Sequence, residues 1–127
     1  MKLKSRPTLR EGKRYIVFNV ITDGSFLYEN LRNAIYDSVA RWLGESEMGK
    51  ADVHVIKNLW DGRARTGFIR CAPKYVDDVK TALALVHQIG ESRVIIHTLR
   101  VSGTIKSARE KAGLSKRAGT AKRGERK

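Results

Sequence analysis

The apolar segments of this chain follow the order strand, helix, strand, strand, helix, strand, and a short helix can close the series. β-Branched and aromatic residues predict strands at 14–21, 52–60, 65–71 and 93–101. Helical spacing of apolar residues and capping signals predict helices at about 25–43, 73–89 and 104–112. This is the order of an α+β, ferredoxin-like or RRM-like βαββαβ sandwich, here with an extra C-terminal helix. Two helices should cover one face of a four-stranded antiparallel sheet.

Glycine and aspartate mark where these segments stop. Gly44 follows the first predicted helix and Gly90 follows the second, where helices commonly end. Residues 45–50 are polar and predict a loop. Asp61-Gly62 predicts a two-residue hairpin turn between the second and third strands, because a tight primed turn needs a positive φ angle at both central positions.

The first and last predicted strands are apolar on both faces. In the first strand, Phe18 and Val20 alternate with Val17 and Ile21. A strand with one wet face would instead alternate apolar and polar residues. If both helices lie on one face of the sheet, the other face also needs a cover. We therefore expect the C-terminal helix or a protein partner to lie there.

The charge of the chain is concentrated at its two ends. Lys and Arg number 26 against 13 Asp and Glu, for a net charge of +13 at pH 7, and nearly all of the excess lies outside 15–102. This pattern predicts a basic N-terminal arm at 1–13, a single folded domain at 14–112 and a basic, disordered tail at 113–127. Basic ends around a nearly neutral domain are typical of proteins that bind a polyanion.

Several classes of protein do not fit this sequence. It has no apolar run near the roughly 18 residues that cross a bilayer, and its start lacks the apolar stretch of a signal peptide, so we expect a cytoplasmic protein without membrane contact. The single cysteine, Cys71, cannot form an intrachain disulfide, and we interpret it as a buried apolar residue. His54, His87 and His97 lack metal-ligand spacing and a paired nucleophile. We expect neither a catalytic site nor a cofactor bound by the protein itself.

The segment from Val101 to Lys106 combines the end of a strand, a glycine and the start of a helix. Ser102 or Thr104 can cap this helix, and a helix start exposes backbone N–H groups that suit a phosphate. Lys106 and Arg109 add positive charge at the same end. Taken alone, the segment fits ordinary helix capping better, whereas the basic tail that follows it favours phosphate binding.

Some domains with this order of elements bind RNA by stacking bases on aromatic residues of the sheet. Their third strand carries a Lys/Arg-Gly-aromatic pattern with a second exposed aromatic residue. The segment here is Thr66-Gly67-Phe68-Ile69-Arg70, in which Arg70 takes the second position. We therefore expect Phe68 to pack inside the protein and not to stack a base.

Three segments together resemble the family of archaeal ribonuclease P protein component 2, whose eukaryotic relative is a subunit of ribonuclease P and MRP. They are residues 7–16 with Pro-Thr-Leu-Arg and Lys-Arg-Tyr-Ile, residues 66–70, and residues 94–106 with Val-Ser-Gly-Thr-Ile-Lys. The similarity runs from about Leu3 to Ala112.

The resemblance implies a supporting role. In ribonuclease P the RNA subunit uses Mg²⁺ to remove the 5′ leader from precursor tRNA. Members of this family bind the catalytic part of that RNA and pair with ribonuclease P protein component 3, and the pair can assemble as a heterotetramer. The candidate RNA-binding residues are Arg6, Arg10, Lys13, Arg14, Arg70, Ser102, Thr104, Lys106, Arg109, Lys116 and Arg117.

Two other functions are compatible with the order of elements. Ferredoxin-like modules often sense small molecules, but a ligand-binding domain would not need the basic ends. A nuclease acting by itself would need clustered carboxylates to hold metal ions, and the sequence offers no such cluster. Salt-sensitive binding to RNA distinguishes the first alternative from an RNA-binding subunit.

Overall fold

A computed structural model describes residues 12–111 of the protein. Its main sheet has the strand order β2-β3-β1-β6, and a separate two-stranded hairpin joins β4 to β5. The strands are β1 (Arg14–Ile21), β2 (His54–Val55), β3 (Thr66–Cys71), β4 (Gln88–Ile89), β5 (Ser92–Arg93) and β6 (Ile95–Ser102). The helices are α1 (Tyr28–Leu43), α2 (Glu45–Ala51), η2 (Lys57–Leu59), η3 (Pro73–Tyr75), α3 (Val76–Leu85) and α4 (Ile105–Lys111).

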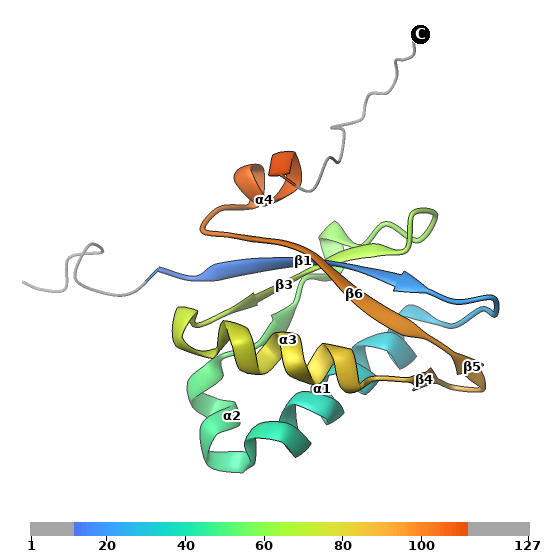
Figure 1. Ribbon diagram of the computed structural model, residues 1–127, viewed down its shortest axis with the longest axis horizontal. Helices are drawn as coiled ribbons and strands as arrows, with labels where there is room; N and C mark the ends of the chain where they lie inside the picture. The colour runs from blue at the N-terminus through green and yellow to red at the C-terminus, as the bar shows by residue number, and fades with distance from the viewer. Residues whose placement is uncertain (1–11, 112–127) are drawn as a thin grey trace, which may run out of the picture.

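The main sheet is antiparallel throughout, with β1 at its centre between β3 and β6. Figure 1 shows α1, α2 and α3 on one side of this sheet and α4 on the other. The fold is therefore ferredoxin-like with an additional C-terminal helix, as the order of the sequence segments predicts. The domain boundaries at 14 and 112 stay a prediction.

The main core lies between the sheet and helices α1 and α3. Ile16, Phe18 and Val20 of β1 point into it and are at most 2% exposed. They meet the apolar stripes of the two helices, which include Ile35 and Leu83. Burying a side chain of this size contributes about 1.5–3 kcal/mol, so this layer supplies most of the apolar stabilisation.

A glycine in β3 lets aromatic rings pack closely in this core. A Cβ atom at Gly67 would lie 2.7 Å from Cζ of Phe18 and 3.0 Å from Cε3 of Trp60. The rings of Phe18 and Trp60 are stacked with their centroids 6.3 Å apart, and Phe26 and Tyr28 tilt against the same indole. Only a residue without a side chain fits beneath this cluster.

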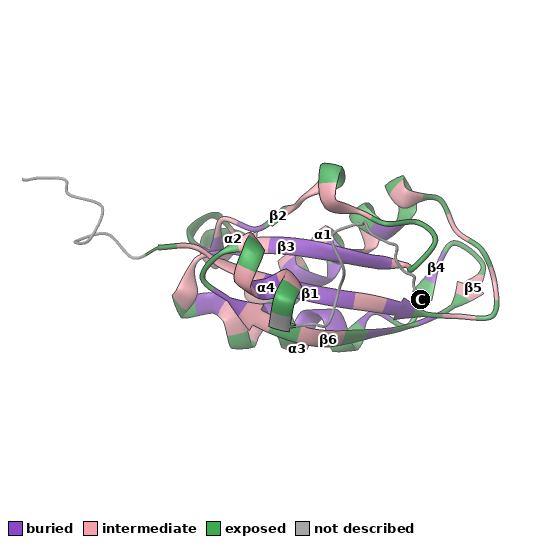
Figure 2. Ribbon diagram, turned by 90° about the horizontal axis from the view of Figure 1, so that it is seen from above, coloured by how far each residue is buried: buried purple, intermediate pink, exposed green. Residues whose placement is uncertain are grey.

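Helix α4 covers part of the opposite face of the sheet. Ala108 is fully buried and packs with Val17 and Phe68, and Ile105 and Leu99 border them. Figure 2 shows α4 lying over β1. The prediction that the second face is covered is confirmed for this part of the sheet, and the cover is the C-terminal helix.

The predicted strand at 52–60 is wrong over most of its length. Only His54–Val55 pairs with β3, and the chain then turns through the short helix η2. Residues 45–50, predicted as a loop, belong to helix α2, which ends at Asp52 in a left-handed conformation with φ 52°. The strand stops after Val55 because the chain coils into η2 from Lys57, which leaves only a short extended segment between the two helices.

The hairpin after β2 is longer than the predicted two-residue turn. Asp61 bridges to Thr66, and the Asp61 carboxylate accepts hydrogen bonds from the backbone N–H groups of Arg63 and Ala64. The positive φ angle falls on Arg65, at 54°, and not on Asp61 or Gly62. The Arg65 guanidinium donates to backbone carbonyl groups of residues 22 and 24 and so holds this strained residue in place.

Helix α3 ends at Leu85, earlier than predicted. Val86 is extended, and the chain forms the β4–β5 hairpin around Gly90, whose φ angle is 61°. Gly90 therefore makes a hairpin turn and does not end the helix. At the end of α1, by contrast, Gly44 has a φ angle of 85° and its N–H donates to the Ala40 carbonyl oxygen, so that helix ends where predicted.

Candidate RNA-binding surface

One end of the sheet brings together cationic residues from both ends of the described chain. Tyr15 pairs with Arg70 on one side and with Ser102 on the other, so the start of β1, the end of β3 and the end of β6 are neighbours. Helix α4 begins a few residues after Ser102. The candidates Lys13, Arg14, Arg70, Lys106 and Arg109 therefore share one region, which we call the α4 surface.

Arg70 lies on the sheet face that α4 partly covers. Its Nε atom is buried and has no hydrogen-bond partner among the residues that the structure describes. A buried donor without a partner costs free energy.

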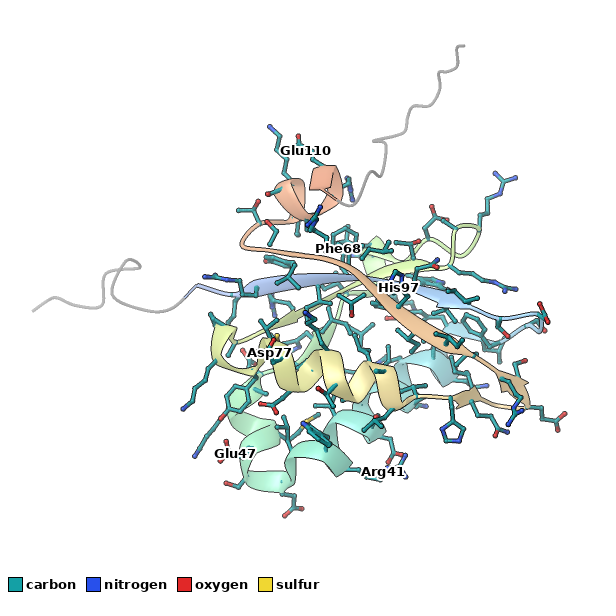
Figure 3. The ribbon with its side chains drawn as sticks, viewed as in Figure 1. Arg41, Glu47, Phe68, Asp77, His97 and Glu110 are labelled. Carbon is teal, nitrogen blue, oxygen red and sulfur yellow. The ribbon has the colours of Figure 1, made fainter. Side chains whose placement is uncertain are left out.

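Arg109 connects α4 to the same face. Its guanidinium carbon lies 5.9 Å from the centroid of the Phe68 ring, and Phe68 is only 2% exposed. Figure 3 shows Phe68 between the sheet and α4, with Glu110 on the outer side of the helix. The expectation that Phe68 packs inside the protein is therefore confirmed, and the ring has no free face for a base.

Lys13 is held in a small charged network. Its Nζ atom lies 2.6 Å from Oδ2 of Asp52, and Oδ1 of Asp52 lies 2.9 Å from Nε2 of His54. The hydrogen bond from Lys13, followed by that from His54, lowers the pKa of the Asp52 carboxyl group. Asp52 therefore stays ionised and fixes Lys13 at the start of β1. The guanidinium group of Arg14 lies beside the turn into α4. A Cβ atom built on Gly103, in that turn, would lie 3.8 Å from Nη1 of Arg14.

The hydroxyl groups of the Ser-Gly-Thr segment have different roles. Oγ1 of Thr104 accepts a hydrogen bond of 3.1 Å from the backbone N–H of Ser107, so Thr104 caps α4. Ser102 is 8% exposed and lies at the end of β6 beneath the turn. Lys106 is exposed on the first turn of α4. Of these three residues, Thr104 and Lys106 are exposed, whereas Ser102 is buried.

Four of the candidate residues lie outside the described range of 12–111: Arg6, Arg10, Lys116 and Arg117. The basic arm and tail that contain them also stay predictions. RNA contact by the described candidates also stays a prediction.

Within residues 12–111, no group of three or more His, Cys, Asp or Glu side chains is arranged to hold a metal ion. Cys71 is fully buried, and burial raises the pKa of its thiol to about 11. It is thus a protonated, apolar core residue, as predicted. In the same range, no helix has the length and apolar character needed to cross a membrane.

A model of the Rpp14/Pop5 family matches residues 14–113, which is most of the chain. The chain belongs to the Rpp14/Pop5 family. Among its curated relatives in this family is "Ribonuclease P protein component 2" of Pyrococcus abyssi, 40% identical over 87% of this chain and 93% of that protein. The protein of the same name from Pyrococcus furiosus is 43% identical over 83% of this chain and 86% of the relative.

A solved structure agrees on the fold. A chain in the cryo-EM structure of yeast ribonuclease MRP superposes with a TM-score of 0.57 over 75% of this Rpp14/Pop5 chain and 76% of that chain, at 10% identity. At this identity the similarity concerns the fold. It agrees with the ferredoxin-like topology described above.

Sequence analysis missed Asp52 as a residue that organises the surface of this Rpp14/Pop5 protein. In the sequence, Asp52 looks like the other aspartates of the chain, which are explained by turns, helix caps and solvated helix faces. The structure shows it both at the end of α2 and between Lys13 and His54. Lys13 and Asp52 are 39 residues apart, so no local pattern could have indicated their ion pair.

Proposed function

We propose that this chain is an RNA-binding subunit of ribonuclease P that lacks catalytic activity of its own. It supports the catalytic RNA while that RNA removes the 5′ leader from precursor tRNA. The observation that carries the proposal is the α4 surface in a member of the Rpp14/Pop5 family: Arg109 lies over Phe68, Lys106 is exposed on the same helix, and Arg70 lies on the sheet face that this helix partly covers. Its partners are the ribonuclease P RNA, ribonuclease P protein component 3 and, in the holoenzyme, precursor tRNA.

The α4 surface favours contacts with the RNA backbone. Phe68 is covered, so base stacking on the sheet is closed off at this point. Arginine and lysine side chains instead suit phosphate groups, and arginine can bind two phosphate oxygens at once. Contacts of this kind fix the position of a protein on RNA, while Mg²⁺ and the bond-breaking chemistry stay with the RNA. The chain would act in the cytoplasm.

A matched pair of double variants tests the RNA-binding surface. Lys106→Ala with Arg109→Ala removes two positive charges from α4, and Lys50→Ala with Lys80→Ala removes two from helices on the other side of the sheet. We expect the first pair to weaken binding to ribonuclease P RNA by about tenfold, on the scale of charge-assisted hydrogen bonds, and the second by less than twofold. Fluorescence anisotropy at several salt concentrations measures both, with circular dichroism as the check of folding.

A random RNA of equal length is the control for specificity. The α4 variant should lose more affinity for ribonuclease P RNA than for the random RNA. Equal losses on both RNAs, or equal effects of the two double variants, would show that α4 is only part of a generic basic surface.

The absence of intrinsic catalysis needs a separate experiment. We expect the purified chain, incubated with precursor tRNA and Mg²⁺, to release no 5′ leader until the RNA subunit is added. Gel analysis of end-labelled precursor tRNA measures this. Maturation at the correct position without the RNA subunit would contradict the proposal.

A further inference from the structure

Strand β6 forms one edge of the main sheet. The strand order β2-β3-β1-β6 gives it a single neighbour, β1, and Figure 2 shows it as the outer strand on its side of the sheet. An edge strand of eight residues presents a row of backbone N–H and C=O groups that another extended chain can bind. Natural proteins protect such edges, so a stretch without protection is a candidate binding surface.

The backbone of β1 shows which of its residues face β6. The Val20 N–H donates to the Arg65 carbonyl oxygen at 2.8 Å, on the β3 side of the strand. Successive residues of a strand direct their backbone groups to opposite sides, so Asn19 and Ile21 face β6. Their partners in β6 are residues 97 and 95, which therefore face β1.

The residues between these partners have outward backbone groups. Ile96 and Thr98 direct their N–H and C=O groups away from β1, by the same alternation. Just before them, the outward N–H of Val94 donates to the His87 carbonyl oxygen at 3.0 Å. Within residues 12–111, no backbone group makes such a hydrogen bond to the outward groups of Ile96 or Thr98. The edge is thus occupied as far as Val94 and free from Ile96 onward.

The two halves of this edge are protected differently. The register between β1 and β6 shifts at Val17 and Phe18, which leaves Leu99 as the extra residue of a bulge, and the exposed Arg100 follows it. A bulge and a charged side chain are two devices that discourage strand pairing. Residues 95–98 keep a regular register and contain neither device. We call residues 95–98 the open β6 edge.

An exposed apolar pair adjoins the open β6 edge. Ile95 is 64% exposed, and Ile21, its partner in β1, is 51% exposed. Ile21 lies on the same face of β1 as Val17, which α4 covers, so the pair occupies the part of this face that α4 leaves uncovered. A strand added to the open β6 edge would place a side chain beside Ile95 and cover it.

The charges around this edge favour an acidic occupant. Strand β6 contains no Asp or Glu, and Arg93, His97 and Arg100 are exposed. The ends of this chain outside residues 15–102 are strongly basic and would be repelled. Two copies of β6 side by side would bring the same basic side chains together. A peptide strand also supplies donors and acceptors at the spacing of the edge, which the backbone of RNA does not match.

We propose that the open β6 edge binds an extended, acidic segment of a different protein by strand addition. The segment pairs with the backbone groups of Ile96 and Thr98, places an apolar side chain beside Ile95 and directs carboxylates toward the basic side chains around the edge. The main sheet thereby gains a fifth strand. The proposal goes beyond the proposed function and does not require that the α4 surface binds RNA.

A labelled peptide with the sequence Glu-Val-Glu-Ile-Glu-Val-Glu is the probe, used with the full chain. Its binding is measured by fluorescence anisotropy and its position by NMR hydrogen exchange. We expect the peptide to slow exchange of the Ile96 and Thr98 amides by about tenfold or more, because both become hydrogen-bonded. The amides of Ile95 and His97 face β1 already and should change little. A peptide with Lys in place of Glu should bind at least about tenfold more weakly.

N-methylation of the peptide tests pairing through the backbone. One peptide carries methyl groups on the amides of its first, third, fifth and seventh residues, and the other on those of the second, fourth and sixth. Only one of these sets can face β6, so one peptide should lose binding and the other should keep it. This comparison needs no change to the protein.

Variants of the chain test the apolar contact. Ile95→Ala should weaken peptide binding by about tenfold, whereas Ile95→Val keeps most of the side chain and most of the affinity. Leu27→Ala is the matched control, because Leu27 is 67% exposed but lies at the start of α1, and it should change binding by less than twofold. Circular dichroism checks that all three variants fold.

Four results would overturn the proposal. The peptide fails to protect the Ile96 and Thr98 amides, or the two N-methylated peptides bind equally. A single-stranded oligouridine displaces the peptide and protects the same amides, which would assign the edge to RNA. Protection without peptide rises with protein concentration, which would assign it to a second copy. Titration of ribonuclease P RNA against the same preparations tests the proposed function separately, and failure there leaves the peptide result unchanged.

Discussion

Arg109 lies over the ring of Phe68 and closes the sheet face where related folds stack a base on an aromatic side chain. The arginine is thus both part of the cover and part of the cationic surface. Under the proposed function, packing and RNA recognition are linked at this point, because any ligand that draws Arg109 away also uncovers Phe68.

Phe68→Ala should destabilise the fold by about 3–5 kcal/mol, because it leaves a cavity between the sheet and α4. Phe68→Leu keeps most of the volume and removes the aromatic ring. We expect Phe68→Leu to bind ribonuclease P RNA within about twofold of the unaltered chain. Urea unfolding and RNA titration measure the two effects, and a large loss of affinity in a folded Phe68→Leu protein would show that the ring contacts a base.

Thr104→Ala should lower stability by about 1 kcal/mol, since the hydroxyl group that caps α4 is removed. Thr104→Ser keeps the hydroxyl and should keep the stability. If capping is its whole role, Thr104→Ser also binds RNA normally. Thermal unfolding followed by circular dichroism provides the test, and equal melting temperatures for Thr104→Ala and the unaltered chain would contradict the assigned cap.

Lys13→Met should raise the pKa of the Asp52 carboxyl group toward its ordinary value, because the strongest hydrogen bond to that carboxylate is removed. A lowered pKa in the folded state stabilises the protein at neutral pH, and this contribution disappears as the pH falls through that pKa. The difference in unfolding free energy between Lys13→Met and the unaltered chain should therefore shrink below about pH 4. This difference in unfolding free energy should be small at any pH, because the side chains of Lys13 and Asp52 are both partly exposed.

Carbon-13 NMR of the Asp52 carboxyl group measures the first effect, and urea unfolding at a series of pH values measures the second. Arg93→Met is a control for the loss of an exposed positive charge outside this network. An unchanged Asp52 titration in Lys13→Met would show that the ion pair does not persist in solution.

Deletion of residues 113–127 should weaken binding to every RNA alike, because a basic tail meets phosphates and not base edges. Each phosphate that the shortened chain no longer neutralises should reduce the slope of log affinity against log salt by about 0.7–0.9. The deletion removes Lys116, Arg117, Lys122, Arg123, Glu125, Arg126 and Lys127. Binding measured between low and high salt gives the slope, and an unchanged slope would show that the tail does not touch RNA.

The parts of the fold with a strong local pattern were predictable from the sequence. The bounds predicted for the first strand match β1, and the third differs from β3 by one residue, because continuous apolar runs leave few alternatives. Helix α2 was not predictable in this way, because Met48 and Ala51 are its only residues that join the main core. A short helix with so few apolar residues shows no clear period.

The segment after α2 shows why composition alone was insufficient. Ile56 and Leu59 both pack with the cluster beneath α4, while Trp60 packs with Phe18 in the main core. In a continuous strand, side chains three positions apart point to opposite faces, so Ile56 and Leu59 could not share one layer. The same limit applied to Trp42, which fits the apolar face of α1 by spacing and yet lies half exposed near the end of that helix.

Strands β1 and β6 are hydrogen-bonded neighbours although they lie at opposite ends of the described chain. Synthesis delivers β6 last, so β1 has no partner on one side while the residues between them emerge from the ribosome. Contacts between such distant segments form slowly, because a long loop must close first. Until residue 102 has emerged, the nascent chain carries an apolar strand with an open edge, which is the form most prone to aggregate.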